Sequence, residues 1–195
     1  MSVRSLLIGV SIAALGTAAA SAADLIIPTT PEPIYEAAGF DWEGLYAGVR
    51  LGGQWVGTNP YGNIGAGAAI TQGVVGAAVG VNFIPVDPLL LGVEVTGDYV
   101  WGNDLSTGEF FANLRAGAVV TDSVMIYALG GVGVQTGPAG AGSAGLYQLG
   151  GGVEFAVTDA ITVRGELVGQ GDFANVAPDN FFESTKATVG VFYHF

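Results

Sequence analysis

The last eleven residues of the chain alternate strictly between two kinds of side chain and end on an aromatic residue. Counting back from Phe195 to Ala187, every second residue is apolar, and those between are mostly small or polar. An alternation of period two with one apolar face predicts a β-strand that meets different media on its two sides. A long terminal strand of this kind is typical of the closing strand of a bacterial outer-membrane barrel. That strand pairs with the first one and leaves no open edge in lipid.

The composition agrees with apolar residues that are dispersed at alternate positions. Half of the 195 residues are hydrophobic, yet no apolar run of transmembrane-helix length follows the first two dozen residues. We therefore expect an all-β fold, an eight-stranded antiparallel up-and-down transmembrane β-barrel. The expected strands are about 44–55, 69–81, 89–100, 108–120, 124–135, 144–156, 161–172 and 182–195.

The connections between these strands alternate in character. Residues 121–123 and 157–160 form tight turns, and residues 83–88 form a somewhat longer one. The other connections, around 58–63, 102–104, 137–140 and 175–180, are rich in Gly, Asn and Pro. Short turns at one end and looser loops at the other are typical of the periplasmic and extracellular ends of a barrel.

The first 43 residues precede the expected barrel and divide into two parts. Residues 1–22 are predicted to be a secretory signal peptide, with Arg4 before an apolar stretch and the small residues 20–22 as a cleavage site. Residues 23–43 carry three prolines and five acidic residues, which predict an extended periplasmic linker. Residues 44–195 are the expected barrel domain.

Charge and cysteine content narrow the function classes. The chain has no Cys, so it has no disulfide framework, and its formal net charge is −12. This negative charge argues against nucleic acid as a partner.

Within the expected strands, the four basic residues and Glu94, Asp98, Glu154 and Glu166 share the parity opposite to the apolar set. They are therefore expected to point inward, where an eight-stranded barrel has just enough room for side chains. We expect pairs that neutralise one another, such as Glu154 with Arg164 and Glu94 with Arg115, rather than a catalytic or conducting site. The expected lumen network comprises Arg50, Glu94, Asp98, Arg115, Glu154, Arg164, Glu166 and Lys186, accompanied by Gln54, Gln135, Gln148 and Gln170.

Aromatic residues on the outward parity gather near the strand ends. Trp55, Tyr99, Trp101, Phe110 and Tyr147 are expected at the loop ends, and Phe155, Tyr193 and Phe195 at the turn ends. Two such belts around an aliphatic band are the girdles of a membrane barrel, whose partner is outer-membrane lipid. Val191, Tyr193 and Phe195 are also the candidate C-terminal signal for the barrel-assembly machinery.

Residues 39–49, Gly-Phe-Asp-Trp-Glu-Gly-Leu-Tyr-Ala-Gly-Val, resemble the first strand of the small opacity-type, porin-like outer-membrane proteins of alphaproteobacteria, which run close to F-D-W-x-G-x-Y-x-G. The resemblance implies an eight-stranded barrel in the cell envelope, exposed at the surface as an antigen. Some members interact with host components or haem, and some are attached to peptidoglycan through a mature N-terminus that begins Ala-Asp. In this chain the corresponding residues are Ala23 and Asp24.

Two further motifs carry less weight. Residues 140–145 match G-x-G-x-x-G, but the pattern that follows is a strand rather than a helix, which predicts a glycine-rich loop. The single histidine, His194, cannot form an ordinary zinc site without Cys partners, and haem ligation by it is a minor alternative. We expect no enzyme activity, metal or cofactor.

The sequence thus favours a structural outer-membrane barrel that supports envelope integrity, with peptidoglycan attachment at its N-terminus as an additional hypothesis. Two alternatives stay open: a narrow porin for small solutes, and a surface module that binds host components or haem. The short loops argue against the second alternative, because binding functions of barrels reside in long loops. The sequence leaves the oligomeric state open.

Overall fold

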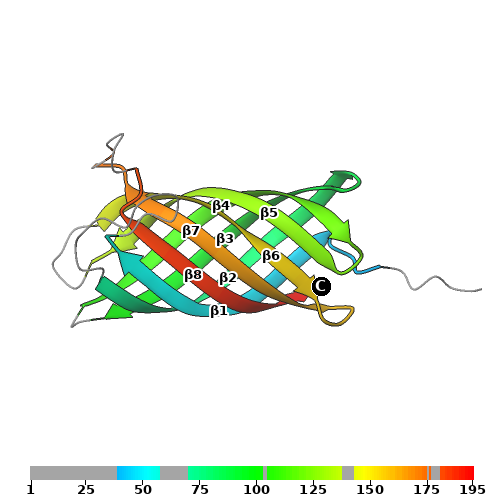
Figure 1. The fold of residues 1–195 in the computed structure, drawn as a ribbon, viewed down its shortest axis with the longest axis horizontal. Helices are drawn as coiled ribbons and strands as arrows, with labels where there is room; N and C mark the ends of the chain where they lie inside the picture. The colour runs from blue at the N-terminus through cyan, green and yellow to red at the C-terminus, as the bar shows by residue number, and fades with distance from the viewer. Residues whose placement is uncertain (1–38, 58–69, 103–104, 138–142, 175, 177–180) are drawn as a thin grey trace, which may run out of the picture. The chain divides into compact units, whose positions relative to one another are not determined.

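A computed structural model describes residues 39–57, 70–102, 105–137, 143–174, 176 and 181–195. These residues belong to one compact unit, Gly39–Phe195, in which eight antiparallel strands close into a barrel (Figure 1). Each strand pairs with its neighbours in the sequence, and β8 pairs with β1 to close the sheet. The predicted fold class is confirmed. The strands are β1 (Gly44–Val56), β2 (Ile70–Val86), β3 (Leu89–Gly102), β4 (Leu105–Thr121), β5 (Val124–Thr136), β6 (Ser143–Ala156), β7 (Ile161–Asp172) and β8 (Ser184–His194).

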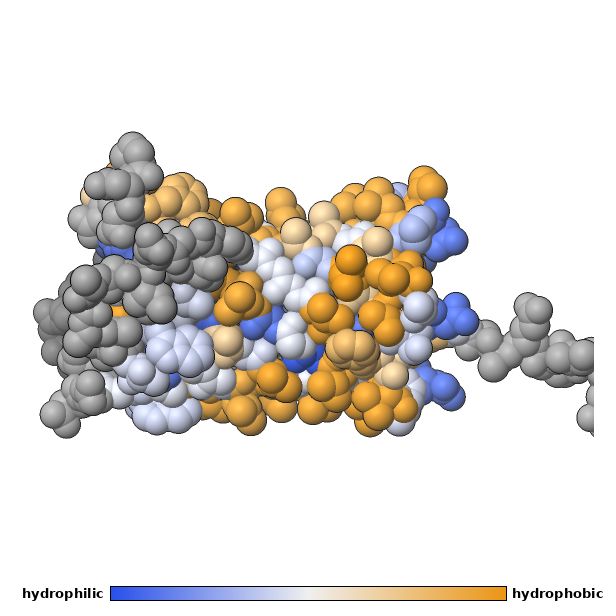
Figure 2. Space-filling model, viewed as in Figure 1, coloured by the Kyte–Doolittle hydropathy of each residue, from blue (hydrophilic) through white to orange (hydrophobic). Residues whose placement is uncertain are grey.

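Among the described residues, no helix combines the length and apolarity needed to cross a bilayer. The strands themselves alternate between outward aliphatic and inward polar residues, as their sequences predict. Val49 on β1 is 64% exposed and Leu114 on β4 is 69% exposed, whereas the neighbouring Arg50 and Arg115 are buried. Figure 2 shows the resulting aliphatic exterior on one face, with hydrophilic side chains at the turn end on its right.

The interior is narrow, and glycines make room in it for large side chains. A β-carbon at Gly80 would overlap the hydroxyl of Tyr46, and one at Gly48 would overlap the ring of Phe192. Since these glycines lie on the inner face of β1 and β2, they let two aromatic rings lie flat against the wall.

The connection between β2 and β3 differs from the prediction. Residues 83–86, expected in a turn, continue β2 with a register shift between Phe83 and Val86, so the turn shrinks to Asp87 and Pro88. Pro85 is tolerated there because β1 pairs with β2 only as far as Asn82, so the missing N–H breaks no ladder bond on that side. Of the four predicted loops, most residues lie outside the described ranges.

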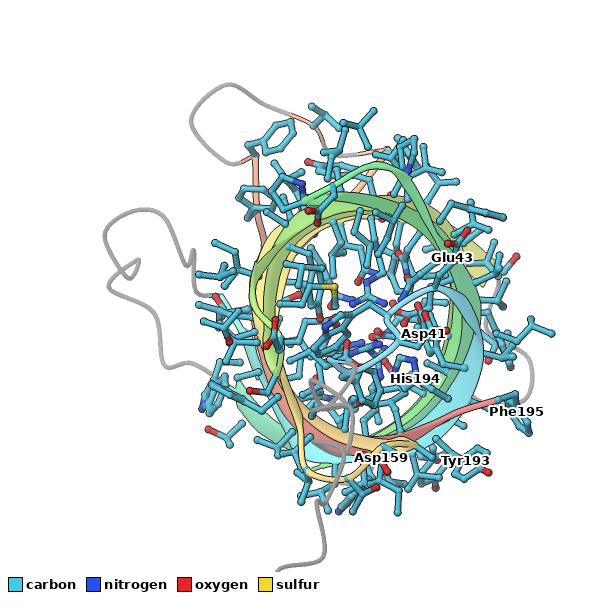
Figure 3. All side chains as sticks on the ribbon, turned by 90° about the vertical axis from the view of Figure 1, so that its right-hand side faces the viewer. Asp41, Glu43, Asp159, Tyr193, His194 and Phe195 are labelled. Carbon is cyan, nitrogen blue, oxygen red and sulfur yellow. The ribbon has the colours of Figure 1, made fainter. Side chains whose placement is uncertain are left out.

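The segment before β1 also differs from the prediction. Residues 39–43, assigned to a solvated linker, cross the turn end of the barrel, where Asp41 lies over the mouth (Figure 3). The amide of Phe40 donates to the carbonyl of Asp122 at 3.2 Å, and Asn82 donates to the carbonyl of Trp42 at 3.1 Å. The prolines and acidic residues of the segment predict a solvated linker, so the sequence pattern does not reveal that residues 39–43 pack against the barrel. The rest of the predicted linker, 23–38, and the predicted signal peptide, 1–22, lie outside the described residues.

Candidate functional site: an ionic lumen closed at its turn end

The inward positions of the strands bring all eight predicted lumen residues into the interior. Each of them is at least nine-tenths buried in the closed barrel. Because charges removed from water must be paired, their geometry decides whether the lumen is stable. The paired side chains form three layers, from the turn end of the lumen to its loop end.

The turn-end layer is organised around two arginines. Arg164 donates to Glu94 at 2.5 Å and to Glu154 at 2.9 Å. Arg115 donates to Glu154 at 3.1 Å and lies 3.8 Å from Glu94. Strand pairing places Glu154 opposite Arg164, as predicted, whereas Arg115 lies closer to Glu154 than to its predicted partner. Two carboxylates thus share two guanidinium groups.

Aromatic rings complete the environment of these two arginines. The guanidinium of Arg164 lies 3.7 Å from the ring centre of Phe192, and that of Arg115 lies 3.9 Å from the ring centre of Tyr127. The hydroxyl of Tyr46 donates to Glu94 at 2.8 Å and accepts from Arg115 at 2.6 Å. Such cation–π and hydrogen-bonding contacts offset part of the desolvation of the buried charges.

The middle layer is built on Arg50. Its guanidinium binds Asp98 in a bidentate manner, at 2.9 and 2.7 Å, and reaches Glu166 at 2.9 Å. Tyr127 donates to the second oxygen of Glu166 at 2.7 Å. Arg50 on β1 therefore connects β3 with β7 across the lumen.

The loop-end layer contains a carboxylate that the sequence analysis missed. Lys186 donates to Asp98 at 2.8 Å and to Glu109 at 2.5 Å. Glu109 also accepts from Gln54 and Gln170, each at 3.2 Å. Its position was available from the sequence, because Glu109 has the same strand parity as Arg115.

Aromatic residues of the N-terminal segment close the turn end of the lumen. Trp42 is 2% exposed and packs with Leu90, Met125 and Phe40 in an apolar cluster. The ring of Phe40 meets those of Trp42 and His194 edge-on, at centroid distances of 4.6 and 4.9 Å. We call residues 39–43 the plug.

His194 lies beneath the plug and points into the barrel (Figure 3). Its Nε2 lies 3.2 Å from Glu154 and 3.3 Å from Thr162, and its ring stacks on Tyr46. A haem iron could reach this ring only if the plug were displaced. Among the described residues, no group of three His, Cys, Asp or Glu side chains is placed to hold a metal ion.

The loop end of the lumen, in contrast, retains space. A cavity of about 330 Å³ lies there, lined by polar strand residues that include Gln54, Glu109 and Gln170. Glu183, which precedes β8, contributes to its wall. Partial burial and the neighbouring Asp172 carboxylate raise the pKa of Glu183 above its ordinary value.

The exterior carries the predicted aromatic residues. Tyr99, Trp101 and Phe110 are exposed near the loop end, and Phe155 is exposed near the turn end. Figure 3 shows Tyr193 and Phe195 pointing away from the lumen at the turn end. Val191, the third residue of the candidate assembly signal, is also exposed, whereas Ala23 and Asp24 lie outside the described residues.

Taken together, an aliphatic exterior, aromatic belts and a closed hydrogen-bonded sheet are the features of a transmembrane barrel. They support a location in the outer membrane, where bacterial barrels of this kind reside.

No protein-family model and no curated protein matches this sequence. Solved structures of similar fold include the N-terminal β-barrel domain of Pseudomonas aeruginosa OprF, with a TM-score of 0.52 and 12% identity over 78% of this chain and 98% of that one. Neisserial surface protein A has a TM-score of 0.51 and 12% identity over 78% of this chain and 97% of that one. At this identity the likeness shows the fold, so the chain is a small eight-stranded barrel similar to these two.

Proposed function

We propose that the protein is a sealed structural barrel of the outer membrane that supports envelope integrity. The observation that carries this proposal is the closure of the lumen by the chain itself. The plug covers the turn end, and beneath it Arg164, Arg115 and Arg50 bind carboxylates from several strands. A barrel closed in this way contributes a stable body to the membrane rather than a path through it.

The strength of the closure follows from the burial of its charges. Removing one partner from a buried ion pair costs about 3–5 kcal/mol, because the other charge is left unpaired in a poorly solvated site. A continuous path past Arg164 and Arg50 would require several such pairs to separate together. This energetic argument favours the structural role over the narrow porin.

We further propose that the chain before the plug connects the barrel to the cell wall. The plug emerges at the turn end, which is the periplasmic end in barrels of this kind. Residues 23–38, at the rise of about 3.1 Å per residue of a polyproline II conformation, would span about 50 Å from Gly39. Ala23 at a mature N-terminus would offer a free α-amine for covalent linkage, with a pKa of about 7.7–8.0.

Conductance in planar bilayers tests the sealed barrel. The purified mature protein is expected to insert without stable unitary current steps. Trp42→Ala combined with Lys186→Ala removes the plug residue and one lumen cation, and any current should appear first in this double variant. Stable steps of uniform size from the unmodified protein would instead support the porin and overturn the structural proposal.

The wall connection is tested on purified sacculi from cells that express the protein. The sacculi are boiled in detergent and digested with trypsin and muramidase, and mass spectrometry is used to search for the Ala23 peptide joined to a muropeptide. We expect the joined peptide, and an Ala23→Pro variant should lack it. Recovery of only the free Ala23 peptide, in the detergent extract, would exclude the connection and leave the barrel as the functional part.

A further inference from the structure

Every glutamine of the chain lies at the loop end of the lumen. The sequence has five, at positions 54, 72, 135, 148 and 170, and they come from five different strands. Gln54, Gln72, Gln135 and Gln170 line the loop-end cavity. Gln148 lies next to them and accepts from Gln170 at 3.3 Å. The cavity of about 330 Å³ is therefore a vestibule to whose wall four glutamine side chains contribute primary amides.

The charged groups on the floor of the vestibule, Glu109 and Lys186, are already occupied. Both oxygens of Glu109 accept hydrogen bonds, one from Gln54 and the other from Gln170 and Lys186. The ammonium of Lys186 is shared between Glu109 and Asp98. A ligand that needs a free carboxylate or a free ammonium group on the floor of the cavity does not find one among these residues.

The side-chain amide of Gln54 has a carbonyl oxygen that accepts no hydrogen bond from the described residues. The side chain of Gln54 is 96% buried, since its exposed fraction is 4%. Its Nε2 donates to Glu109, but no described residue donates to its Oε1. A buried acceptor without a donor is costly. Because this oxygen has almost no accessible surface in the unliganded barrel, a ligand in the cavity gains this bond when the Gln54 side chain turns toward it.

We propose that this vestibule binds a small neutral polyhydroxylated solute, of the size of one sugar ring. A hydroxyl group both donates and accepts, and a primary amide offers both functions side by side. Val56 and Leu146 add apolar wall, which suits the C–H face of a sugar ring. The volume lies at the low end of the roughly 300–1,000 Å³ of small-molecule pockets, which suits a single ring better than an oligosaccharide.

Charge also favours a neutral ligand. An anion would meet the carboxylates of Glu109 and Glu183 in the cavity wall, and Lys186 is already neutralised. A cation would find only Glu183, because Glu109 is saturated by its three donors. The inference goes beyond the proposed structural role, since a cavity that lies above the plug can be occupied whether or not the barrel conducts.

Because all glutamines lie at the loop end of the lumen, the NMR signals of their side-chain amides report directly on binding in the vestibule. We would label the mature barrel in detergent micelles with ¹⁵N at the glutamine side-chain amides, so that every side-chain resonance reports on this region. Glucose, galactose and N-acetylglucosamine would be titrated separately to about 100 mM, which detects dissociation constants in the millimolar range. We expect at least one of these sugars to cause saturable shifts, whereas choline and acetate cause none.

Variants then assign the effect to the vestibule. Gln54→Leu should weaken the binding by about tenfold or more, and Asp159→Asn, an exposed change at the turn end, should leave it unchanged. If Gln54→Leu does not fold, as judged by its heat-dependent gel mobility, the half-buried Gln135→Leu replaces it with the same expectation. The proposal is overturned if no sugar gives a saturable shift, if choline or acetate gives equal shifts, or if the folded variant binds as tightly as the unmodified barrel.

Discussion

The two ends of the lumen solve the same packing problem in different ways. At the turn end, arginines, glutamates and aromatic rings fill the interior, and Trp42 and Phe40 cover it. At the loop end, glutamine amides form part of the wall of a cavity, and among the described residues there Lys186 supplies the positive charge. The two ends therefore differ in how they are filled: side chains occupy and cover the turn end, whereas the loop end keeps a cavity.

The same contrast predicts different responses to substitution. At the turn end, a lost charge or ring leaves its partners in a space closed by protein. At the loop end, water in the cavity can solvate what a substitution leaves behind. Matched substitutions at the two ends therefore test whether the described geometry governs the stability of the barrel.

The largest difference is expected between Arg164→Ala and Lys186→Ala. Removal of Arg164 leaves Glu94 and Glu154 to share Arg115, and should lower the free energy of unfolding by about 3–5 kcal/mol. Removal of Lys186 should cost about 1–3 kcal/mol, because Asp98 keeps Arg50 and Glu109 borders the cavity. Urea titration of both variants in the same lipid vesicles measures this difference.

Arg164→Lys is the control for this pair, since it keeps the charge and loses the planar fork. It should fall between the unmodified barrel and Arg164→Ala. Equal losses for Arg164→Ala and Lys186→Ala would mean that water reaches both ends of the lumen alike, and the contrast between the ends would fail.

Trp42→Ala should release the plug while leaving the strands intact. Truncation of a buried tryptophan costs about 3–5 kcal/mol, and here most of this loss falls on the docking of residues 39–43. We expect faster amide exchange at Phe40 and His194, whose amides bond to the carbonyls of Asp122 and Ala160. Exchange at the loop-end residues should not change. Leu45→Ala, an exposed change two residues beyond the plug, is the control. Faster amide exchange throughout the barrel of Trp42→Ala would contradict this prediction and show that the plug and the strands unfold as one cooperative unit.

A smaller contrast is expected between Met125→Ala and Leu146→Ala. Met125 is fully buried in the apolar cluster beneath the plug, so its truncation should cost about 2–5 kcal/mol. Leu146 already borders the loop-end cavity, so its truncation enlarges an existing space and should cost about 1 kcal/mol. Thermal unfolding followed by gel mobility ranks the two variants, and a larger loss for Leu146→Ala would contradict the closed turn end.

The sequence was sufficient for the part of this architecture that depends on strand parity. The alternation at residues 187–195, extended to every strand, placed Arg50, Glu94 and Lys186 inside and Val49 outside. Strand pairing at the tight β6–β7 turn also brought Glu154 opposite Arg164. Glu109 follows the same rule, because its parity on β4 matches that of Arg115, so the sequence is sufficient to place it in the lumen as well.

Other features depend on distances that parity does not supply. The contact of Arg50 with Glu166 crosses the lumen between β1 and β7, which are not hydrogen-bonded neighbours, so strand register alone cannot predict it. The plug was hidden because two aromatic residues lie beside acidic ones and follow three prolines, a composition typical of a solvated linker. Pro85 led to the wrong prediction of a turn at residues 83–86. It lies beyond Asn82, the last residue of β2 that pairs with β1, and this position is known only once the strands are paired in the sheet.

The smallest effect is expected at the rim of the loop end, from Glu183→Gln. The raised pKa of Glu183 means that folding disfavours its ionised form, first through partial burial and second through the neighbouring Asp172 carboxylate, so this residue lowers stability once the pH rises through its titration range. The neutral amide should therefore raise the free energy of unfolding at pH 7 by about a few tenths of a kcal/mol, because the group is only partly buried and solvent screens its interaction with Asp172. Below about pH 4, where the carboxyl is protonated in both states, the variant and the unmodified barrel should coincide.

Urea titrations at pH 3 and pH 7 check the sign. A gain that persists at pH 3 would assign the effect to packing, and a loss at pH 7 would mean that the Glu183 carboxylate has a cationic partner rather than an acidic neighbour.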